Sequence, residues 1–310
     1  MHFESVNPAT GERFAEYAHA SPPEIEAQLQ SAHEAHLEWR NVSVEARTDP
    51  LRTLARLLRE QKKLHGELMT REMGKPITQA IAEVEKCALV CEYYADIASS
   101  ALAPVPVETD ASTSYWTYRP LGVVLGIMPW NFPYWQVIRF ATPALTAGNA
   151  VLLKHAPNVP GCAFSIERLL CEAGYPEGLL VQLRLDVENT GELIDDARIQ
   201  GVSLTGSVRA GRAVAARAGA AIKKCVLELG GSDPSIVLAD ADLDSAAASC
   251  ATGRFINSGQ SCVAAKRFVV VDAVRESFEE KLLRAIDAWP LGDPLDPSTG
   301  VGPMARTDLR

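Results

Sequence analysis

The second part of the chain alternates short aliphatic runs with amphipathic segments. Seven runs rich in Val, Ile and Leu are predicted strands: 123–128, 150–153, 179–183, 202–205, 224–229, 236–238 and 268–271. Helical patterns fall near 134–146, 161–173, 207–219, 242–256 and 274–288. This alternation is typical of parallel α/β sheets that are covered by helices on both faces. Ligands bind such sheets at the carboxyl ends of the strands, so the loops there are candidate sites.

The first 120 residues have a different pattern. Residues 1–20 contain turn signals and are predicted to form strands and turns, whereas 21–103 are predicted to be helical. Leu51, Leu54 and Leu58 recur at helical spacing, with charged residues between them. Residues 113–119 alternate polar and aromatic side chains, which predicts an exposed strand.

Composition narrows the possible functions. The chain has 310 residues, 47% of them hydrophobic, and a formal net charge of −9, which indicates a globular protein of about two domains. The acidic surplus disfavours nucleic acid and anionic membranes as partners. The longest apolar stretch, 121–130, is too short to span a bilayer.

The cysteines and histidines indicate the cellular compartment and whether a metal site is expected. Seven cysteines without a C-x-x-C pair fit a reducing cytoplasm better than a disulfide framework. His33 and His36 are three residues apart on a polar helix, where a solvated pair is favoured over a metal site.

Two loops after predicted strands present groups suited to anions. The loop 129–133 reads Pro-Trp-Asn-Phe-Pro, and the Asn131 carboxamide could donate to a developing oxyanion; an asparagine turn beside packed aromatics is the alternative. Gly206 and Ser207 lead from a strand into a helix whose free N–H groups could bind a pyrophosphate, unless the turn serves packing alone. The pair at 212–213 is Arg-Ala, not the Lys-Ser/Thr of a P-loop, which disfavours a nucleoside triphosphatase.

Two further loops carry a carboxylate and a thiol. Glu228 stands between two leucines at a strand end, where desolvation would raise its pKa toward that of a general base. A structural pair with Lys223 or Lys224 is the alternative. Cys262 lies in the Gly/Ser/Gln-rich loop 257–267, whereas the other six cysteines fall in helical or strand-like segments and are predicted to be buried.

Together these loops resemble the aldehyde dehydrogenase superfamily. Pro-Trp-Asn-Phe-Pro, Leu-Leu-Lys, Thr-Gly-Ser, Leu-Glu-Leu-Gly-Gly and Gly-Gln-x-Cys occur in that family's order. The likeness extends from 7–12 through 71–76 to 302–303, and the segments 154–158 and 225–234 look most like the bacterial succinate-semialdehyde dehydrogenase (NAD(P)+) branch.

The resemblance implies an α/β fold of two domains. Residues 1–227 would hold the N-terminal helices and a Rossmann-like NAD(P)-binding domain, with 113–120 part of an oligomerisation strand. Residues 228–310 would form a second α/β catalytic domain. The family continues well beyond the equivalent of Arg310, so this domain is expected to be incomplete, and a full-length chain is expected to form a homo-oligomer.

The resemblance also assigns roles. The Cys262 thiolate would attack a small-molecule aldehyde, and the oxyanion would be held by the Asn131 side chain and the Cys262 backbone N–H. After hydride transfer, Glu228 would activate the water that hydrolyses the thioester. The implied cofactor-binding residues are Trp130, Asn131, Lys154, His155, Ala156, Pro157, Gly206, Ser207 and Leu229. No metal is implied.

The sequence differs from the family's pattern in two ways that affect the choice of cofactor and of substrate. Many NAD-preferring relatives carry a Glu where this chain has Pro157, so Lys154 could pair with a 2′-phosphate and NADP is expected to serve at least as well as NAD. Arg139 matches an arginine that binds the distal carboxylate of succinate semialdehyde, unless it is only a surface residue. A second arginine of some relatives aligns with Ile256, so half of that clamp is missing.

Two classes of function therefore stay open. One is NAD(P)-dependent oxidation of an aldehyde, with succinate semialdehyde favoured and a broader range of aldehydes next. The other is an inactive fragment that retains at most nucleotide binding.

Overall fold

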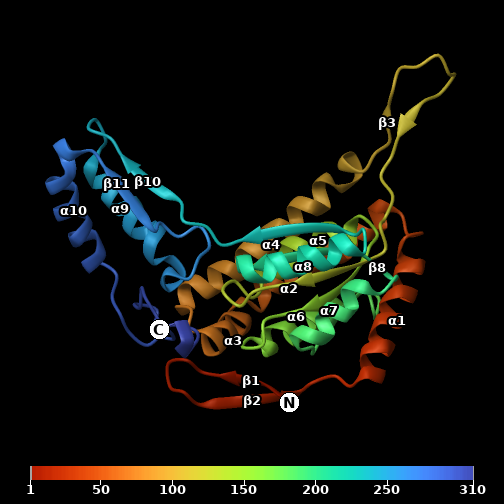
Figure 1. The fold of residues 1–310 in the computed structure, drawn as a ribbon, viewed down its shortest axis with the longest axis horizontal. Helices are drawn as coiled ribbons and strands as arrows, with labels where there is room; N and C mark the ends of the chain where they lie inside the picture. The colour runs from red at the N-terminus through yellow and green to blue at the C-terminus, as the bar shows by residue number, and fades with distance from the viewer. Residues whose placement is uncertain (1, 310) are drawn as a thin grey trace.

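The computed structural model describes residues 2–309, and its main body is built on a five-stranded parallel sheet of order β7-β6-β5-β8-β9 (Figure 1). The strands are β5 (Val123–Ile127), β6 (Ala150–Lys154), β7 (Leu180–Leu183), β8 (Ile199–Gly206) and β9 (Lys224–Leu229). The chain runs outward from β5 to β7 and then returns to the other side of β5 for β8. The crevice at the carboxyl ends of β5 and β8 is therefore the topological switch point, where α/β sheets bind ligands.

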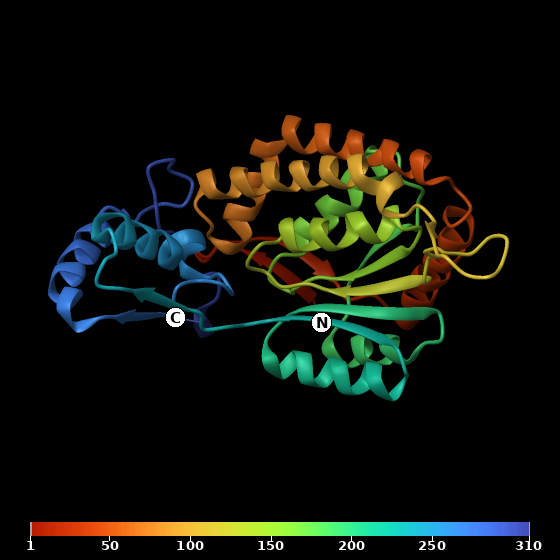
Figure 2. The same cartoon turned by 90° about the horizontal axis from the view of Figure 1, so that it is seen from above.

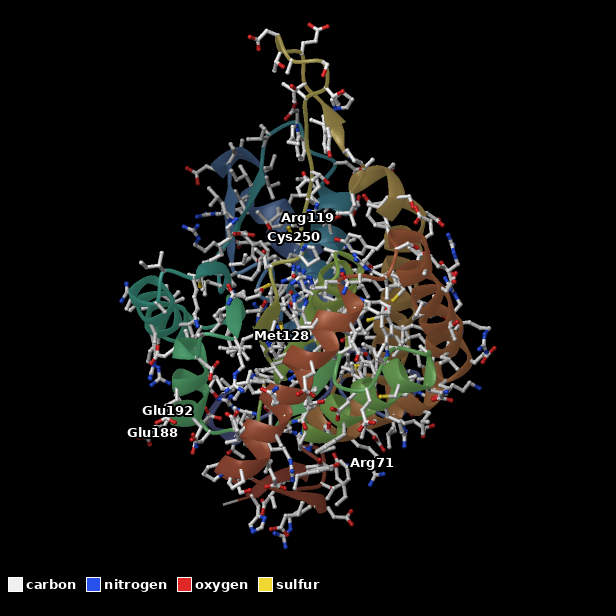
Figure 3. All side chains as sticks on the ribbon, turned by 90° about the vertical axis from the view of Figure 1, so that its right-hand side faces the viewer. Arg71, Arg119, Met128, Glu188, Glu192 and Cys250 are labelled. Carbon is white, nitrogen blue, oxygen red and sulfur yellow. The ribbon has the colours of Figure 1, made fainter. Side chains whose placement is uncertain are left out.

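Helices cover both faces of this sheet (Figure 2). The connecting helices are α5 (Trp135–Thr146), α6 (Pro160–Glu172), α7 (Val187–Asp195) and α8 (Val208–Ala220). The N-terminal helices are α1 (Pro22–Trp39), α2 (Val44–Glu60), α3 (Lys62–Met73) and α4 (Ile77–Ala101). Helices α2, α3 and α4 pack behind α5 and α6, whereas α1 packs on β6 and β7. Figure 3 shows Met128, just after β5, in the middle of the molecule and Glu188 and Glu192 of α7 at its periphery.

The apolar pattern of the sequence explains the large core of this body. Leu51, Leu54 and Leu58 on α2 are fully buried, together with the aliphatic residues of β5 and β6. Leu64, on α3, is 55% exposed, because it faces a surface hollow instead of the sheet.

Two antiparallel pairs extend from this body. The hairpin of β1 (His2–Val6) and β2 (Arg13–Ala18) follows the predicted strands and turns. The short pair β3 (Val105–Pro106) and β4 (Tyr115–Trp116) forms an arm that projects away from the helices (Figure 1). The strand predicted over 113–119 is thus present but limited to two residues.

A smaller unit follows β9. It contains β10 (Pro234–Val237) and β11 (Arg267–Val270), which pair in parallel, with α9 (Leu243–Phe255) and α10 (Arg275–Asp287). Short 3-10 turns span Ile256–Gly259, Asp272–Val274 and Thr307–Leu309. Its own core gathers around Val237, Ala247, Cys250 and Phe278. The segment after α10 then returns to the main body, where Pro294 O accepts from Ile77 N at 2.8 Å.

The predicted α/β fold with a parallel sheet is confirmed, and each predicted strand is present. Among the seven aliphatic strands, the largest shift is at β8, which begins at Ile199 instead of 202. Helix α7 was not predicted, because Gly191 and its polar neighbours obscure the apolar period; its signal was the Asp186 cap, which accepts from Asn189 N at 2.9 Å. The domain boundary at 227/228 stays a prediction, although the β9 ladder itself continues to Leu229.

Three local predictions were wrong. Strand β9 is not covered on both faces, since Val226 is 60% exposed at this edge of the sheet. Of the six cysteines predicted to be buried, Cys171 is exposed and Cys225 is only partly buried. His36 is not solvated but buried, and its Nδ1 lies 3.0 Å from Gly148 O. Within residues 2–309, no helix has the length and apolarity needed to cross a membrane.

Candidate active site

The predicted catalytic residues line one cavity. It has a volume of about 730 Å³ and lies at the carboxyl ends of β5, β8 and β9, against the Cys262 loop. Its lining includes the following site residues predicted from the sequence: Trp130, Asn131, Arg139, Gly206, Ser207, Glu228, Leu229 and Cys262. Residues from four separate loops thus meet at the switch point of the sheet.

Asn131 is held directly against the nucleophile loop. Its Nδ2 donates to the carbonyl oxygen of Gln260 at 2.8 Å, two residues before Cys262. This bond uses one of the two amide hydrogens and fixes which atom of the carboxamide is nitrogen. The second hydrogen is left to donate to a ligand in the cavity.

The loop that carries Asn131 is anchored by a buried ion pair. Glu83 Oε1 accepts from the backbone N–H groups of Tyr134 (3.0 Å) and Trp135 (2.9 Å) at the start of α5. Its other oxygen pairs with Lys75, whose ammonium lies 4.0 Å from the centroid of the Phe132 ring. Burial lowers the pKa of Lys75, and the Glu83 carboxylate opposes that change. Sequence reasoning assigned no role to this pair, since nothing in the pattern of α4 marks Glu83 as inward-facing.

Cys262 lies in a turn where its thiol is partly accessible. Ala264 N donates to Ser261 O at 3.2 Å, which closes the turn, and Lys266 Nζ bonds to Cys262 O at 3.3 Å. The Cys262 backbone N–H has no hydrogen-bond partner among residues 2–309, so it is free to donate into the cavity.

Glu228 differs from its predicted environment. The side chain lies in the cavity lining but is exposed to solvent, not desolvated between its leucine neighbours. The reason is that β9 is an edge strand with little packed against it. The alternative pairing also fails, since no ion pair joins Glu228 to Lys223 or Lys224 among residues 2–309. Lys223 Nζ bonds instead to the carbonyl oxygens of Ile194 (2.6 Å) and Asp196.

Cations dominate the charged lining of the cavity. Arg139 donates from Nε to Gln136 Oε1 at 2.9 Å and from Nη2 to Thr205 Oγ1 at 3.4 Å, both neutral acceptors. Lys86 and Lys266 also line the cavity, and Glu228 is the one carboxylate among its lining residues. No motif in the sequence marks Lys86 as a site residue, since it lies on α4, far from the recognised motifs.

The remaining predicted cofactor residues lie at the end of β6, outside the cavity lining. Lys154 is half-buried; burial lowers its pKa, and Asp186 opposes this. Buried His155 joins two loops, since its Nδ1 accepts from Ala156 N (2.8 Å) and its Nε2 donates to Pro133 O (3.0 Å). Ala156 is buried and Pro157 is exposed.

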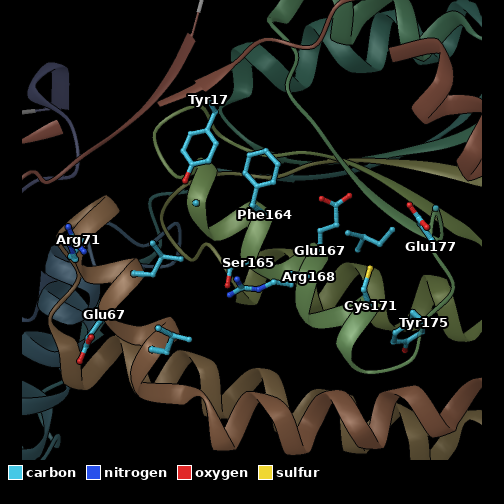
Figure 4. A pocket seen from close by; sticks show the side chains of 15 residues that line it. Tyr17, Glu67, Arg71, Phe164, Ser165, Glu167, Arg168, Cys171, Tyr175 and Glu177 are labelled. Atoms are coloured by element: carbon cyan, nitrogen blue, oxygen red, sulfur yellow. The ribbon is translucent and has the colours of Figure 1, made fainter. Parts of the chain in front are cut away.

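A larger hollow lies elsewhere, between α3 and α6 (Figure 4). Its volume is about 1000 Å³, and charged groups of both signs line it, among them Glu67, Arg71 and Arg168. None of the predicted site residues lines it, so size alone would have misplaced the site.

Comparison with known proteins identifies the family of this chain. The model of the aldehyde dehydrogenase family matches residues 1–309. The chain belongs to the aldehyde dehydrogenase family. Four of the five motifs named above line the 730 Å³ cavity, and the fifth, Leu-Leu-Lys, ends β6 outside its lining.

Similar aldehyde dehydrogenases include succinate-semialdehyde enzymes. The succinate semialdehyde dehydrogenase [NAD(P)+] Sad of Escherichia coli K12 is 47% identical over 309 residues, covering 100% of this chain and 67% of that protein. A probable succinate-semialdehyde dehydrogenase [NADP(+)] of Synechocystis is 49% identical, with coverage of 100% and 68%.

A solved structure shares the fold. The succinic semialdehyde dehydrogenase of Streptococcus pyogenes, in complex with NADP+, has a TM-score of 0.96 at 37% identity, covering 99% of this chain and 68% of that one. This aldehyde dehydrogenase chain therefore spans about two thirds of the length of these relatives.

The buried imidazole of His155 predicts acid sensitivity. Burial lowers its pKa to about 4, against 6.5 in the unfolded chain, so its contribution to stability is complete above about pH 6.5 and is lost as the pH falls toward 4. We expect the free energy of unfolding to fall by about 2 kcal/mol between pH 7 and pH 5 through this residue. Urea denaturation at both pH values should give a smaller fall in His155→Gln than in the parent chain. Equal falls in the two proteins would contradict the assignment.

Proposed function

We propose that this chain catalyses NAD(P)+-dependent oxidation of an aldehyde at Cys262, with succinate semialdehyde as the preferred substrate. The observation that carries the proposal is the contact between Asn131 Nδ2 and Gln260 O, which brings an amide donor beside the cysteine loop in one cavity. The names of the similar proteins support the same chemistry.

The chemistry follows from the groups in the cavity. The Cys262 thiolate adds to the carbonyl carbon, and the developing oxyanion accepts from the free amide hydrogen of Asn131 and from the Cys262 N–H. Bound NAD(P)+ supplies the hydride acceptor for the oxidation. Glu228 takes a proton from the water that attacks the acyl group on Cys262, and its exposure leaves it open to solvent water.

The strand ends fit a dinucleotide. Gly206 and Ser207 precede α8, whose first N–H groups have no intrahelical acceptor and favour a pyrophosphate. No ion pair joins Lys154 to a carboxylate among the residues that the structure describes. Its half-buried ammonium would gain a partner in a ribose hydroxyl or a 2′-phosphate, close to His155, Ala156 and Pro157, which follow it in the chain. Trp130 and Leu229 would contact the part of the cofactor that enters the cavity.

The cavity's charge favours an anionic aldehyde. Arg139 bonds only neutral acceptors in its surroundings, so its guanidinium keeps an unneutralised charge for a substrate carboxylate. Ile256, at the position of the missing arginine, is 43% exposed. A similar solved enzyme, an indole-3-acetaldehyde dehydrogenase complexed with NAD+, keeps a broader aldehyde range as the second candidate.

Location and assembly complete the proposal. All seven cysteines are free thiols, which supports a reducing cytoplasm. The projecting arm around Tyr115 and Trp116 exposes aromatic side chains, which supports a role in homo-oligomerisation. We place the catalytic unit in residues 228–310 and the nucleotide-binding unit in 1–227.

Replacing the nucleophile tests the reaction. With succinate semialdehyde and NADP+, formation of reduced nicotinamide should fall by about 1000-fold or more in Cys262→Ala. Cys171→Ala, a control at an exposed cysteine in the α3–α6 hollow, should keep the parent rate. A parent chain that binds NADP+ but turns over no aldehyde would favour the alternative of a nucleotide-binding protein.

Cofactor choice tests Lys154. The parent should use NADP+ at least as well as NAD+, and Lys154→Met should raise the KM for NADP+ by about 10-fold or more while changing that for NAD+ less. Steady-state kinetics with both nucleotides gives the comparison. A much higher kcat/KM with NAD+ in the parent chain would refute the expectation.

Substrate choice tests Arg139. Because it would hold a carboxylate by charged hydrogen bonds, Arg139→Ala should raise the KM for succinate semialdehyde by about 10- to 100-fold. The kcat/KM for butanal, which has the same chain length and no carboxylate, should change little. Arg275→Ala, at an exposed arginine that starts α10, serves as the control. An unchanged KM in Arg139→Ala would exclude the carboxylate role.

A further inference from the structure

We infer that Asn257 is a positioning residue that holds the Asn131 carboxamide in register with the Cys262 loop. The inference rests on the proposed function, in which Asn131 donates to the oxyanion. Asn257 lies outside the lining of the cavity and is 1% exposed, so it would act through its neighbours and not on the substrate.

The backbone at Asn257 is left-handed. Three consecutive residues have positive φ angles: Asn257 (58°), Ser258 (54°) and Gly259 (73°). The left-handed region is unfavourable for residues other than glycine, with asparagine among the least penalised. This turn reverses the chain between α9 and Cys262 and directs the Asn257 side chain toward the Asn131 loop.

The side chain of Asn257 bridges the two loops. Its Nδ2 lies 2.7 Å from Asn131 O and 3.3 Å from Gln260 O, and it donates to both. Gln260 O in turn accepts from Asn131 Nδ2 at 2.8 Å. These contacts close a ring that holds Asn131 at its main chain and at its carboxamide, across more than 120 positions of sequence.

The side-chain amide of Asn257 is oriented so that its nitrogen, and not its oxygen, makes hydrogen bonds. Asn257 Oδ1 is buried and has no hydrogen-bond partner among the described residues, which is unfavourable for an amide oxygen. Turning the amide over would place that oxygen against two carbonyl oxygens. The side chain is therefore oriented by the two loops that it joins.

A second anchor fixes the turn to the helical layer. Gln79 Oε1, from α4, accepts from Asn257 N at 2.6 Å, and Gln79 Nε2 donates to Gly300 O at 3.0 Å. The turn cannot shift without breaking this link as well, so Asn257 provides Asn131 with a fixed reference point.

The first test observes the Asn131 amide directly. The chain has seven asparagines, so a protein labelled with ¹⁵N-asparagine gives few side-chain amide signals in NMR, and Asn131→Ala identifies that of Asn131. Asn257→Gly keeps the left-handed backbone and removes both donors. We expect the Asn131 amide pair to shift and broaden in this variant.

The matched control is Ser258→Gly. Ser258 is also left-handed, but its Oγ accepts from Gly302 N at 2.9 Å and makes no hydrogen bond to Asn131. The Asn131 signals should stay in place in this variant. Unchanged Asn131 signals in Asn257→Gly, or equal shifts in both variants, would overturn the inference.

The second test is a kinetic double-mutant cycle. Asn257→Gly should lower kcat by about 10- to 100-fold with little change in the KM for NADP+. Because it acts through Asn131, the double variant Asn257→Gly/Asn131→Ala should be no slower than Asn131→Ala alone. Reductions that multiply would refute the positioning role. A parent chain without aldehyde oxidation would refute the proposed function instead, and the NMR result would still decide the inference.

Discussion

The geometry of the site depends on the buried pair of Glu83 and Lys75. Glu83 accepts from two N–H groups at the start of α5, so it satisfies donors that a helix start leaves without partners and fixes where the preceding loop ends. Lys75 neutralises the carboxylate and contacts the Phe132 ring. Removing either partner would leave a buried charge uncompensated, at a cost of about 3–5 kcal/mol. The helical layer thus determines the position of Asn131.

The nucleophile is held by a different part of the molecule. Cys262 follows α9, whose residues pack in the small core around Val237 and Phe278 and not in the core of the main sheet. The hydrogen bonds that join Asn131 to Gln260 and to Asn257, and the link from Gln79 to Asn257, are direct bonds between the two parts beside the cavity. The catalytic geometry therefore requires that both cores fold and that these few hydrogen bonds hold the Asn131 loop and the Cys262 loop in position relative to each other.

The sequence predicted the strands and the motif loops because both have local signatures. Buried parallel strands are continuous aliphatic runs, and the loops after β5, β8 and β9 carry glycine, proline and asparagine at characteristic places. The exposure of Glu228 could not be predicted, because it depends on which strand lies at the edge of the sheet. Lys86 and Glu83 were missed for a related reason: helix α4 places them at the site through tertiary packing, which leaves no mark in the local pattern.

The charge of the cavity opposes that of the whole chain. With a net charge of −9, the long-range field repels an anionic aldehyde and does not steer it. Screening limits that repulsion to about 8 Å at physiological ionic strength. Among the residues that line the cavity, Lys86, Arg139 and Lys266 stand against Glu228 alone. Preference for a carboxylate must therefore come from contacts that the substrate makes once it is inside the cavity. It should appear in the dissociation rate constant of the substrate more than in its association rate constant.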